Sequence, residues 1–325
     1  MKGGRSCSGS IGRRMGDVGW LERQNASEAI VSRAASDRYW EVVQRWRTAE
    51  FVVFVLVPTG LAIVAQFIHT IGTGAAVVGF AMTLVDAAIA YPLIATARRR
   101  AAQAQDRFDS LALSLPESRI RQLGGPDTAE TFAAAASQSK KRAKYNRNWY
   151  SPKLGTLDIE MGRIACMRES TAWDGGLRDR YVRLIAVAVI FILLAFIVYG
   201  VQAALTMEEF VVRILFPLTP AILWAGREIW DNREASETVN RLRSVLADLW
   251  SDALQGRASR EVVHAQVIEL QSAIFAYRQA TSPVPDLLYR PARGRATATM
   301  EQVAEDLVEQ YNRASIQRRE LGHVE

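Results

Sequence analysis

The sequence is poor in the residues from which metal centres and disulfide frameworks are built. Only two of the 325 residues are cysteine, Cys7 and Cys166, so no disulfide framework is possible, and we expect Cys166 to be a reduced, cytosolic thiol. The three histidines, His69, His264 and His323, lie far apart and lack the spacing of metal ligands. The sequence therefore predicts no metal site.

Catalytic motifs are also missing. The sequence contains no nucleophile elbow, kinase signature or dinucleotide fingerprint. The stretch GTGAAVVGF lacks the lysine and the hydroxyl residue of a phosphate-binding loop, and it lies in an apolar segment. We therefore predict a protein that is not an enzyme, needs no cofactor and has no DNA partner.

Long apolar segments are what the sequence does have. A mean hydropathy of -0.01, with 49% hydrophobic and 23% charged residues, indicates that the two kinds are segregated into blocks. Four segments approach the roughly 20 apolar residues that a helix needs to cross about 30 Å of hydrocarbon: Ala49–His69, Gly74–Ala95, Leu184–Ala204 and Phe210–Ala225. Only the residues TIGT separate the first two segments, and only the residues LTMEE separate the last two. We therefore predict an all-α membrane protein with four transmembrane helices in two hairpins and a helical cytoplasmic unit.

Lysine and arginine predict the orientation, because positively charged loops stay in the cytoplasm. The two short turns contain neither residue, whereas RYWEVVQRWR, ARRR, LRDRYVR and GREIWDNR flank the other ends of the spans. Both termini and the middle segment are thus predicted to be cytoplasmic. Six aromatic residues fall near the span boundaries, as in an aromatic belt: Trp40, Trp46, Tyr91, Tyr199, Trp224 and Trp230.

The boundaries of the spans divide the chain into six parts. The first 22 residues carry positive charge without a following apolar run, so we expect a disordered leader rather than a signal peptide. A juxtamembrane helix (23–48), the first hairpin (49–95), a basic helical segment (96–183), the second hairpin (184–225) and a helical segment (226–325) follow. Two apolar stripes are expected in the last segment: Val239, Leu242, Leu246, Leu249 and Ala253, and Val263, Val267, Leu270, Ile274 and Tyr277.

Capping boxes predict where two further helices begin. Asp127 with Glu130 would start a helix in the middle segment, and Thr299 with Gln302 would start the last helix.

The positive charge is concentrated in the middle segment. Residues 98–183 contain 17 basic and 10 acidic residues, a net charge of +7, whereas residues 227–325 have a net charge of -2. Attraction to anionic lipid headgroups is one interpretation. Binding of a phosphate-rich ligand is the other, and charge alone does not separate them.

Asp86 is the unusual residue inside the predicted spans. It lies 12 residues past Gly74, or about 18 Å along a helix, and shares a face with Gly79 and Thr83. An ionisable residue at that depth marks either a pore-lining position or a hydrogen-bonded group at a helix interface. Arg213 in the fourth span is too shallow from the opposite side to be its natural partner.

Prolines distinguish the fourth span. Pro217 and Pro220 remove backbone donors, so they are expected to kink or break this helix. A kinked span is compatible both with gating and with a purely structural role.

The segment NWYSPKLGTLDIEMGRIACMRESTAWDGGLRDRY resembles the SMODS-associating four-transmembrane effectors of bacteria. That family has an Asn-Trp-Tyr loop followed by Cys-Gln-Arg, Trp-Asp and Leu-Arg before the third span. The matching residues are Asn148, Trp149, Tyr150, Cys166, Arg168, Trp173, Asp174, Leu177 and Arg178. ERQNA, AQAQDRFDSLALSLP and SPVPDLLYRPARGRATATMEQVAEDLVEQ also stand where the family has similar text, whereas Met167 and Ser170 depart from its pattern.

The resemblance implies an inner-membrane effector of an anti-phage system. Such effectors accompany nucleotidyltransferases that make cyclic oligonucleotides, and they are thought to permeabilise the membrane. The expected partners are therefore the lipid bilayer, further copies of the chain, the linked nucleotidyltransferase and its cyclic oligonucleotide product. A membrane-anchored sensor or scaffold without pore activity is the alternative.

The family segment also contains the candidate ligand-binding or coupling residues. Arginines such as Arg168 and Arg178 would pair with phosphates, and Trp149, Tyr150 or Trp173 would stack a base. In the alternative interpretation, carboxylates such as Asp174 neutralise the arginines and the aromatic residues pack at the headgroup level.

The predicted topology can be tested with reporter fusions. Fusions at Gly72 and Met207 should report a periplasmic location, and fusions at Gly125 and after Glu325 a cytoplasmic one, because only the first two sites lie in turns without Lys or Arg. A cytoplasmic signal at Met207 would contradict the fourth span.

Overall fold

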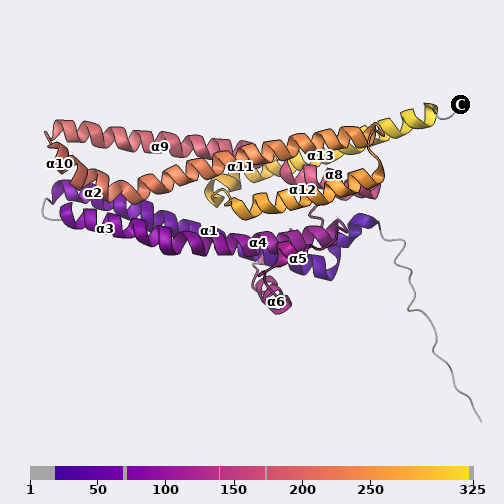
Figure 1. The fold of residues 1–325 in the computed structure, drawn as a ribbon, viewed down its shortest axis with the longest axis horizontal. Helices are drawn as coiled ribbons and strands as arrows, with labels where there is room; N and C mark the ends of the chain where they lie inside the picture. Colours follow the sequence, from indigo (N-terminus) through magenta and orange to yellow (C-terminus); the bar gives the residue numbers. More distant parts are fainter. Residues whose placement is uncertain (1–18, 69–71, 139, 173, 322–325) are drawn as a thin grey trace, which may run out of the picture.

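A computed structural model describes residues 19–68, 72–138, 140–172 and 174–321. The described residues form helices and connecting loops without a strand, in an elongated molecule with two halves (Figure 1). Helices α1 to α4 and α9 to α11 form the membrane half. Four long helical stretches, which also extend into the other half, each contain a segment apolar enough to cross a membrane: 27–67, 73–112, 159–202 and 207–254. The predicted all-α, four-span architecture is thus confirmed.

The first hairpin pairs two interrupted helices. One helix comprises α1 (Ser27–Phe51), the π-helical turn η2 (Val52–Leu56) and α2 (Val57–Phe67). The other comprises α3 (Gly72–Val85), the π-helical turn η4 (Asp86–Ala90) and α4 (Tyr91–Ala112). Helices α1 and α4 pack side by side far beyond the predicted membrane boundary, so this hairpin continues into the half of the molecule outside the spans (Figure 1). The sequence predicts that this half is cytoplasmic, and we call it the cytoplasmic half.

The second hairpin has the same long form. Helix α9 (Asp174–Gln202) returns through α10 (Met207–Phe210) and the π-helical turn η6 (Val211–Leu215) into α11 (Phe216–Leu254). Helix α11 packs against α9 and α3, and it joins the two hairpins. The prolines do not break the helix of the fourth span, because it continues through Pro220 to Leu254.

The π-helical turns have a common cause. Each ends two residues before a proline: Pro58, Pro92 and Pro217. A proline has no N–H, and its ring collides with the carbonyl four residues earlier, so a widened turn relieves the conflict without ending the helix. Three spans therefore contain a built-in irregularity, whereas α9 runs through the membrane as a regular helix.

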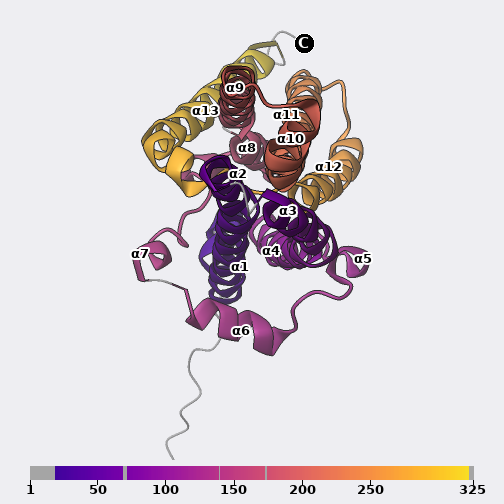
Figure 2. The same ribbon diagram turned by 90° about the vertical axis from the view of Figure 1, so that its left-hand side faces the viewer.

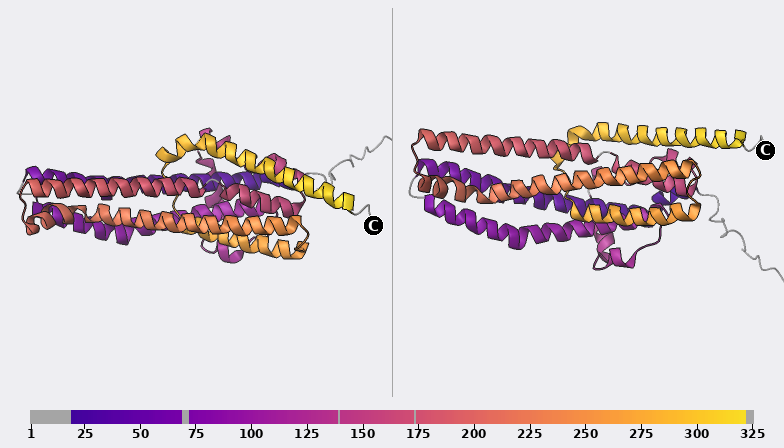
Figure 3. Two further views of the ribbon diagram at one scale, coloured as in Figure 1. Left: turned by 90° about the horizontal axis from the view of Figure 1, so that it is seen from above. Right: turned by 45° about the horizontal axis from the view of Figure 1, so that its top comes forward.

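The remaining elements lie before, between and after the two hairpins, at the end of the molecule away from the short turns. They are the 3-10 turn η1 (Trp20–Asn25), α5 (Arg119–Gln122), α6 (Thr128–Ala136), α7 (Lys140–Ala143), the 3-10 turn η5 (Pro152–Thr156), α8 (Ile159–Thr171), α12 (Arg260–Ala280) and α13 (Asp286–Leu321). Helices α12 and α13 lie in the cytoplasmic half of the molecule (Figure 3).

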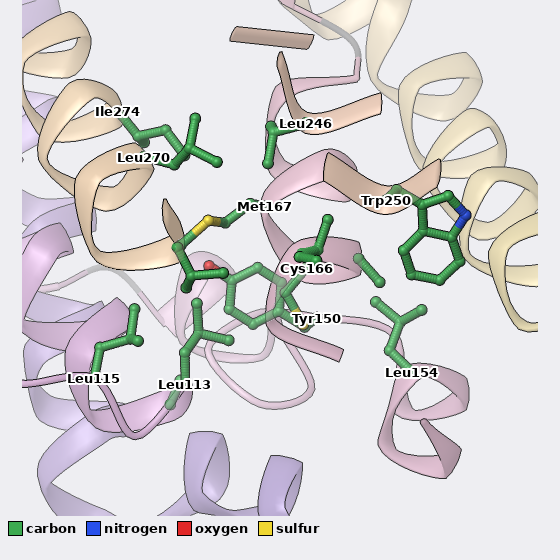
Figure 4. Packing of buried hydrophobic residues seen from close by; sticks show 14 of the residues in the cluster. Leu113, Leu115, Tyr150, Leu154, Cys166, Met167, Leu246, Trp250, Leu270 and Ile274 are labelled. Carbon is green, nitrogen blue, oxygen red and sulfur yellow. The ribbon is translucent and has the colours of Figure 1, made fainter. Parts of the chain in front are cut away.

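Helix α8 forms the centre of the cytoplasmic core. Its residues Met161, Ile164, Cys166 and Met167 are buried in one cluster with side chains of α4, α11, α12 and α13. Figure 4 shows Cys166 and Met167 in this cluster with Leu246 of α11 and Leu270 of α12. Both predicted stripes contribute to this cluster, with Ala253 at its edge. The burial of apolar area, at about 25 cal/mol per Å², explains why these helices associate outside the membrane.

The predicted helix starts have different outcomes. Asp127 and Glu130 form the expected capping box of α6. The prediction at Thr299 is wrong, because α13 already begins at Asp286 and Thr299 lies in its interior. The preceding residues are rich in alanine and arginine, whose high helix propensity favours an earlier start.

Only the last residues of the predicted leader, 19–22, are described. Its first 18 residues lie outside the described residues, whereas Trp20 and Leu21 are in η1 and pack against the core. The indole of Trp20 donates to the carbonyl of Leu157 at 3.0 Å and lies against Gly162.

A close contact between spans two and four predicts the effect of one small substitution. A Cβ on Gly79 would lie 2.7 Å from the carbonyl oxygen of Phe216 and 2.9 Å from Cα of Pro217. Gly79→Ala should therefore push α3 from α11 and destabilise the protein by about 1–3 kcal/mol. Thermal unfolding in detergent measures this loss. Gly74→Ala is the matched control, because its Cβ meets no atom within 4 Å, and equal stabilities of the two variants would contradict the prediction.

Candidate functional site at the junction of membrane and cytoplasm

Asp86 is paired with an arginine from the fourth span. The guanidinium of Arg227 donates to Asp86 Oδ2 at 2.9 Å and also to Glu50 of α1. Arg213, the partner considered from the sequence, pairs with Glu209 at 3.1 Å near the short turn at the other end of the span. Asp86 is therefore a buried ion-pair partner in this structure.

A second ion pair lies beside the first. Arg47 of α1 binds both carboxylate oxygens of Glu228 in α11, and the hydroxyl of Tyr181 in α9 donates to Glu228 at 3.0 Å. We call the set Arg47, Glu50, Asp86, Tyr181, Arg227 and Glu228 the charged junction. It joins all four long helices.

Burial makes the charged junction costly to disrupt. The residues Glu50 and Glu228 are 3% and 1% exposed. Removing one partner of a buried ion pair leaves an uncompensated charge, at a cost of about 3–5 kcal/mol. The junction contains three carboxylates and two guanidiniums, and neither Asp86 Oδ1 nor Glu50 Oε2 accepts a hydrogen bond from the described residues. Arg227 is shared between Asp86 and Glu50, whereas Arg47 binds both oxygens of Glu228, so the Arg227 side is the weaker side of the junction.

Arg178 connects the charged junction to the cytoplasmic core. It is 4% exposed and donates to Asn232 Oδ1 at 2.9 Å, to the carbonyl of Ser282 at 3.0 Å and to the hydroxyl of Tyr277 at 3.1 Å. Asn232 in turn donates to the backbone carbonyl of Glu228 at 2.9 Å. The guanidinium of Arg178 is thus committed to contacts with α11, α12 and the turn after α12.

The turn that follows α12 is held by three membrane helices. Besides Arg178 of α9, Gln44 of α1 donates to the carbonyl of Val284 at 3.0 Å, and Arg98 of α4 donates to the hydroxyl of Ser282 at 3.1 Å. A displacement of this turn therefore acts on several spans at once.

Tyr150 belongs to the cytoplasmic core. Its side chain is 1% exposed, stacks on Phe108 at 6.1 Å and donates to Asp109 at 2.7 Å. Burial, with the nearby carboxylate of Asp109, raises the pKa of Tyr150 well above its ordinary value. The side-chain amide of Gln24 bonds to the backbone N–H and C=O of Tyr150. In this structure the ring has no face open to a base.

The other candidate ligand-binding residues differ in whether their side chains are covered by protein contacts. The guanidinium of Arg33 covers the ring of Trp149, 3.5 Å from its centroid. Arg168 is half-buried over the ring of Trp250 and has no carboxylate partner among the described side chains, and burial lowers its pKa. Trp173 lies outside the described residues, as does the side chain of Asp174.

The pore candidates of the second span face α11. Gly79 contacts the backbone of Phe216 and Pro217, and the hydroxyl of Thr83 donates to the carbonyl of Gly79 at 3.1 Å. With Asp86 bound to Arg227, this face is covered within the protomer.

Sequence reasoning missed a buried acidic pair in α4. Asp106 accepts from Arg121 at 3.0 Å and from Gln271 at 2.9 Å, and Asp109 binds Arg278 as well as Tyr150. The signal was a pair of acids three residues apart on either side of the buried Phe108. No group of His, Cys, Asp or Glu able to hold a metal ion occurs among the described residues.

Glu169 connects the Asn-Trp-Tyr loop to α8. Its carboxylate is 3% exposed and accepts the backbone N–H of Ser151 at 3.1 Å. Burial, reinforced by the charge of Glu301 on α13 and opposed by the Ser151 hydrogen bond, raises the pKa of Glu169 to about 7.

These contacts define a class of protein: a four-span helical membrane protein in which the helices outside the membrane are joined to the spans by buried polar contacts. The chain belongs to the family of the SMODS-associating 4TM effector domain, whose model matches residues 21–307. It is 24% identical over 277 residues to a probable CBASS effector molecule of Bacillus cereus (strain VD146), covering 83% of this chain and 91% of that protein. No solved structure matches the chain. The resemblance predicted from the sequence is confirmed.

The raised pKa of Glu169 predicts a pH-dependent effect of its substitution. The ordinary pKa is 4.5 and the folded value about 7, so the folded protein binds more protons than the unfolded chain between these values. Stability therefore falls as the pH rises through this window. Glu169→Gln has no charge to bury. Its free energy of unfolding should therefore exceed that of the parent by about 1–3 kcal/mol at pH 8 and equal it near pH 4.5. Thermal unfolding at both pH values measures the difference.

The exposed Glu305 of α13 offers a matched control. Glu305→Gln should change stability by less than about 0.5 kcal/mol at either pH. If Glu169→Gln raised the free energy of unfolding equally at both pH values, the burial of charge would not be the cause of the increase.

Proposed function

We propose that this protein is an inner-membrane effector of a nucleotide-signalled anti-phage system, which oligomerises and permeabilises the membrane when its cytoplasmic unit is triggered. Membership in the effector family, together with the four long apolar helices, supports this proposal. The similarity to a probable CBASS effector molecule supports the link to defence. No catalytic residue is assigned in this proposal.

One structural observation carries the proposal. The charged junction joins all four long helices, and Asn232 and Arg178 connect it to the turn after α12. A rearrangement of the cytoplasmic core would therefore be transmitted to the spans through a few polar contacts. A set of spans that served only as an anchor would need no such continuous connection.

Opening would involve the second and fourth spans. The face with Gly79, Thr83 and Asp86 is covered by α11 in the described protomer, so a water-filled conduit requires α3 and α11 to separate. The π-helical turns η4 and η6 lie on these two helices, and widened turns of this kind are frequent at functional sites. Several protomers would then each contribute this face to a shared lumen.

The trigger would act on the cytoplasmic core. An anionic nucleotide is the ligand implied by the family, and Arg168 is the candidate for contacting it, because its guanidinium has no carboxylate partner among the described side chains. Tyr150 and Arg178 would then transmit the signal through their buried contacts rather than bind the nucleotide.

The alternative function is a membrane-anchored sensor or scaffold. Membrane potential discriminates between the two, measured in cells that express the chain with an active nucleotidyltransferase and in cells where the nucleotidyltransferase is inactive. Depolarisation that requires both proteins supports the effector. An unchanged potential, with the protein present in the membrane, supports the scaffold.

Weakening the charged junction should open the membrane without the signal. Asp86→Asn and Arg227→Gln each remove one side of the 2.9 Å ion pair. If the pair stabilises the closed state, each variant should raise the fraction of cells that are depolarised without the signal at least about tenfold. A loss of about 1.4 kcal/mol shifts the equilibrium between closed and open states tenfold. The double variant should add little to either single one. Asp86→Leu also breaks the pair, but its apolar side chain in the lumen should keep water out, so this variant should not conduct even when the signal is present.

Arg213→Gln is the matched control for this experiment. It removes an arginine from the same helix but from the opposite membrane boundary, so it should leave basal depolarisation unchanged. Parental behaviour of both Asp86 variants, at equal membrane levels, would show that Asp86 is purely structural.

A further inference from the structure

Seen along the long axis, residues 116–138 and 140–147 lie outside the area occupied by the spans (Figure 2). We call this segment, which contains α5, α6 and α7, the rim. Viewed along the long axis from the membrane end (Figure 2), the three helices surround the hairpin of α1 and α4 and project beyond it. The area beneath the rim therefore belongs to lipid rather than to the protomer's own spans.

Contacts with α4 fix the height of the rim above the membrane. Arg99 donates to the carbonyl of Leu123 at 2.9 Å, and Arg100 pairs with Glu130 at the start of α6. Arg99 lies four residues after Ala95, the predicted end of the second span, and this separation is about 6 Å along a helix. The nearer part of the rim is thus at the level of the lipid headgroups.

The rim exposes large apolar side chains. Ile120 is 84% exposed, Leu123 70% and Phe132 56%. On α6, the exposed alanines 129, 133 and 136 stand at helical spacing beside Phe132 and complete an apolar face. An exposed apolar face formed by these side chains indicates an interaction surface.

Positive charge accompanies this apolar face. The rim has seven lysines or arginines and three acids, a net charge of +4. Arg99, Arg119, Lys140 and Lys144 are exposed around it. Apolar side chains flanked by basic residues are typical of helices that lie in the membrane interface, and anionic headgroups attract such residues.

We infer that the rim is a lipid-docking surface that inserts Phe132, Ile120 and Leu123 between the anionic headgroups of the cytoplasmic leaflet. The rim holds the α1–α4 hairpin at a fixed height and tilt relative to the bilayer. The inference rests on the predicted orientation of the spans and is independent of pore activity.

Spin labels on the full chain in lipid vesicles test this inference. Phe132→Cys is made in a Cys7→Ser background, where the remaining Cys166 is buried, and the unsubstituted background gives the labelling blank. Accessibility to oxygen, which partitions into lipid, is compared with accessibility to a water-soluble nickel complex. Leu194→Cys in the third span, where Leu194 is 54% exposed, is the lipid reference. Arg257→Cys, in the distal loop between α11 and α12, is the water reference.

In phosphatidylglycerol vesicles, the label at 132 should show an oxygen-to-nickel ratio at least about twofold above that at 257. Phosphatidylcholine vesicles, or high salt, should reduce this excess, because they remove or screen the headgroup charge. A ratio at 132 equal to that at 257 would overturn the inference. So would an excess that does not depend on headgroup charge, or one that appears only at high protein-to-lipid ratio, which would indicate contact with a second copy.

Discussion

The pairing of buried charges where the spans leave the hydrocarbon is the constraint on which the rest of the structure depends. A carboxylate such as Asp86 is tolerated at this depth only with a partner, and its partner Arg227 also binds Glu50. Because the ion pairs have specific geometry, they fix the rotation of α1, η4 and α11 about their axes. Apolar packing alone would leave these rotations poorly determined, since lipid is as apolar as the side chains.

The same constraint explains why the cytoplasmic core is built on extensions of the spans. Once α1, α4 and α11 leave the membrane with fixed rotations, their continuations present defined faces to each other. The buried acids Asp106 and Asp109 of α4 then meet Gln271 and Arg278 of α12, and Tyr150 completes this polar layer. The core and the spans therefore share the helices α1, α4 and α11.

Periodicity and hydropathy predicted much of this fold, because both depend on local sequence. The four spans, the two hairpins, the stripes around Leu246 and Leu270, and the capping box at Asp127 follow from spacing alone. The ion-pair partners did not follow, because a sequence gives the depth of a residue but not its rotation relative to other helices. Arg227 lies beyond the predicted end of the fourth span, so nothing local connected it with Asp86. Similarly, the sequence marked Tyr150 as notable, but only its contacts with Gln24 and Asp109 show that it is part of the core.

The third span raises the question of which surface would meet another protomer. Tyr181 holds one end of α9 to Glu228, and Gly200 lies against Phe210 at the other end. Between these points Val187 and Phe191 are 65% and 72% exposed. Such exposure does not itself indicate an interface, because hydrocarbon covers apolar side chains as well as a second protein does. The argument for oligomers rests instead on the polar face of the second span, which α11 now covers and which needs water or protein, rather than lipid, whenever the two helices separate.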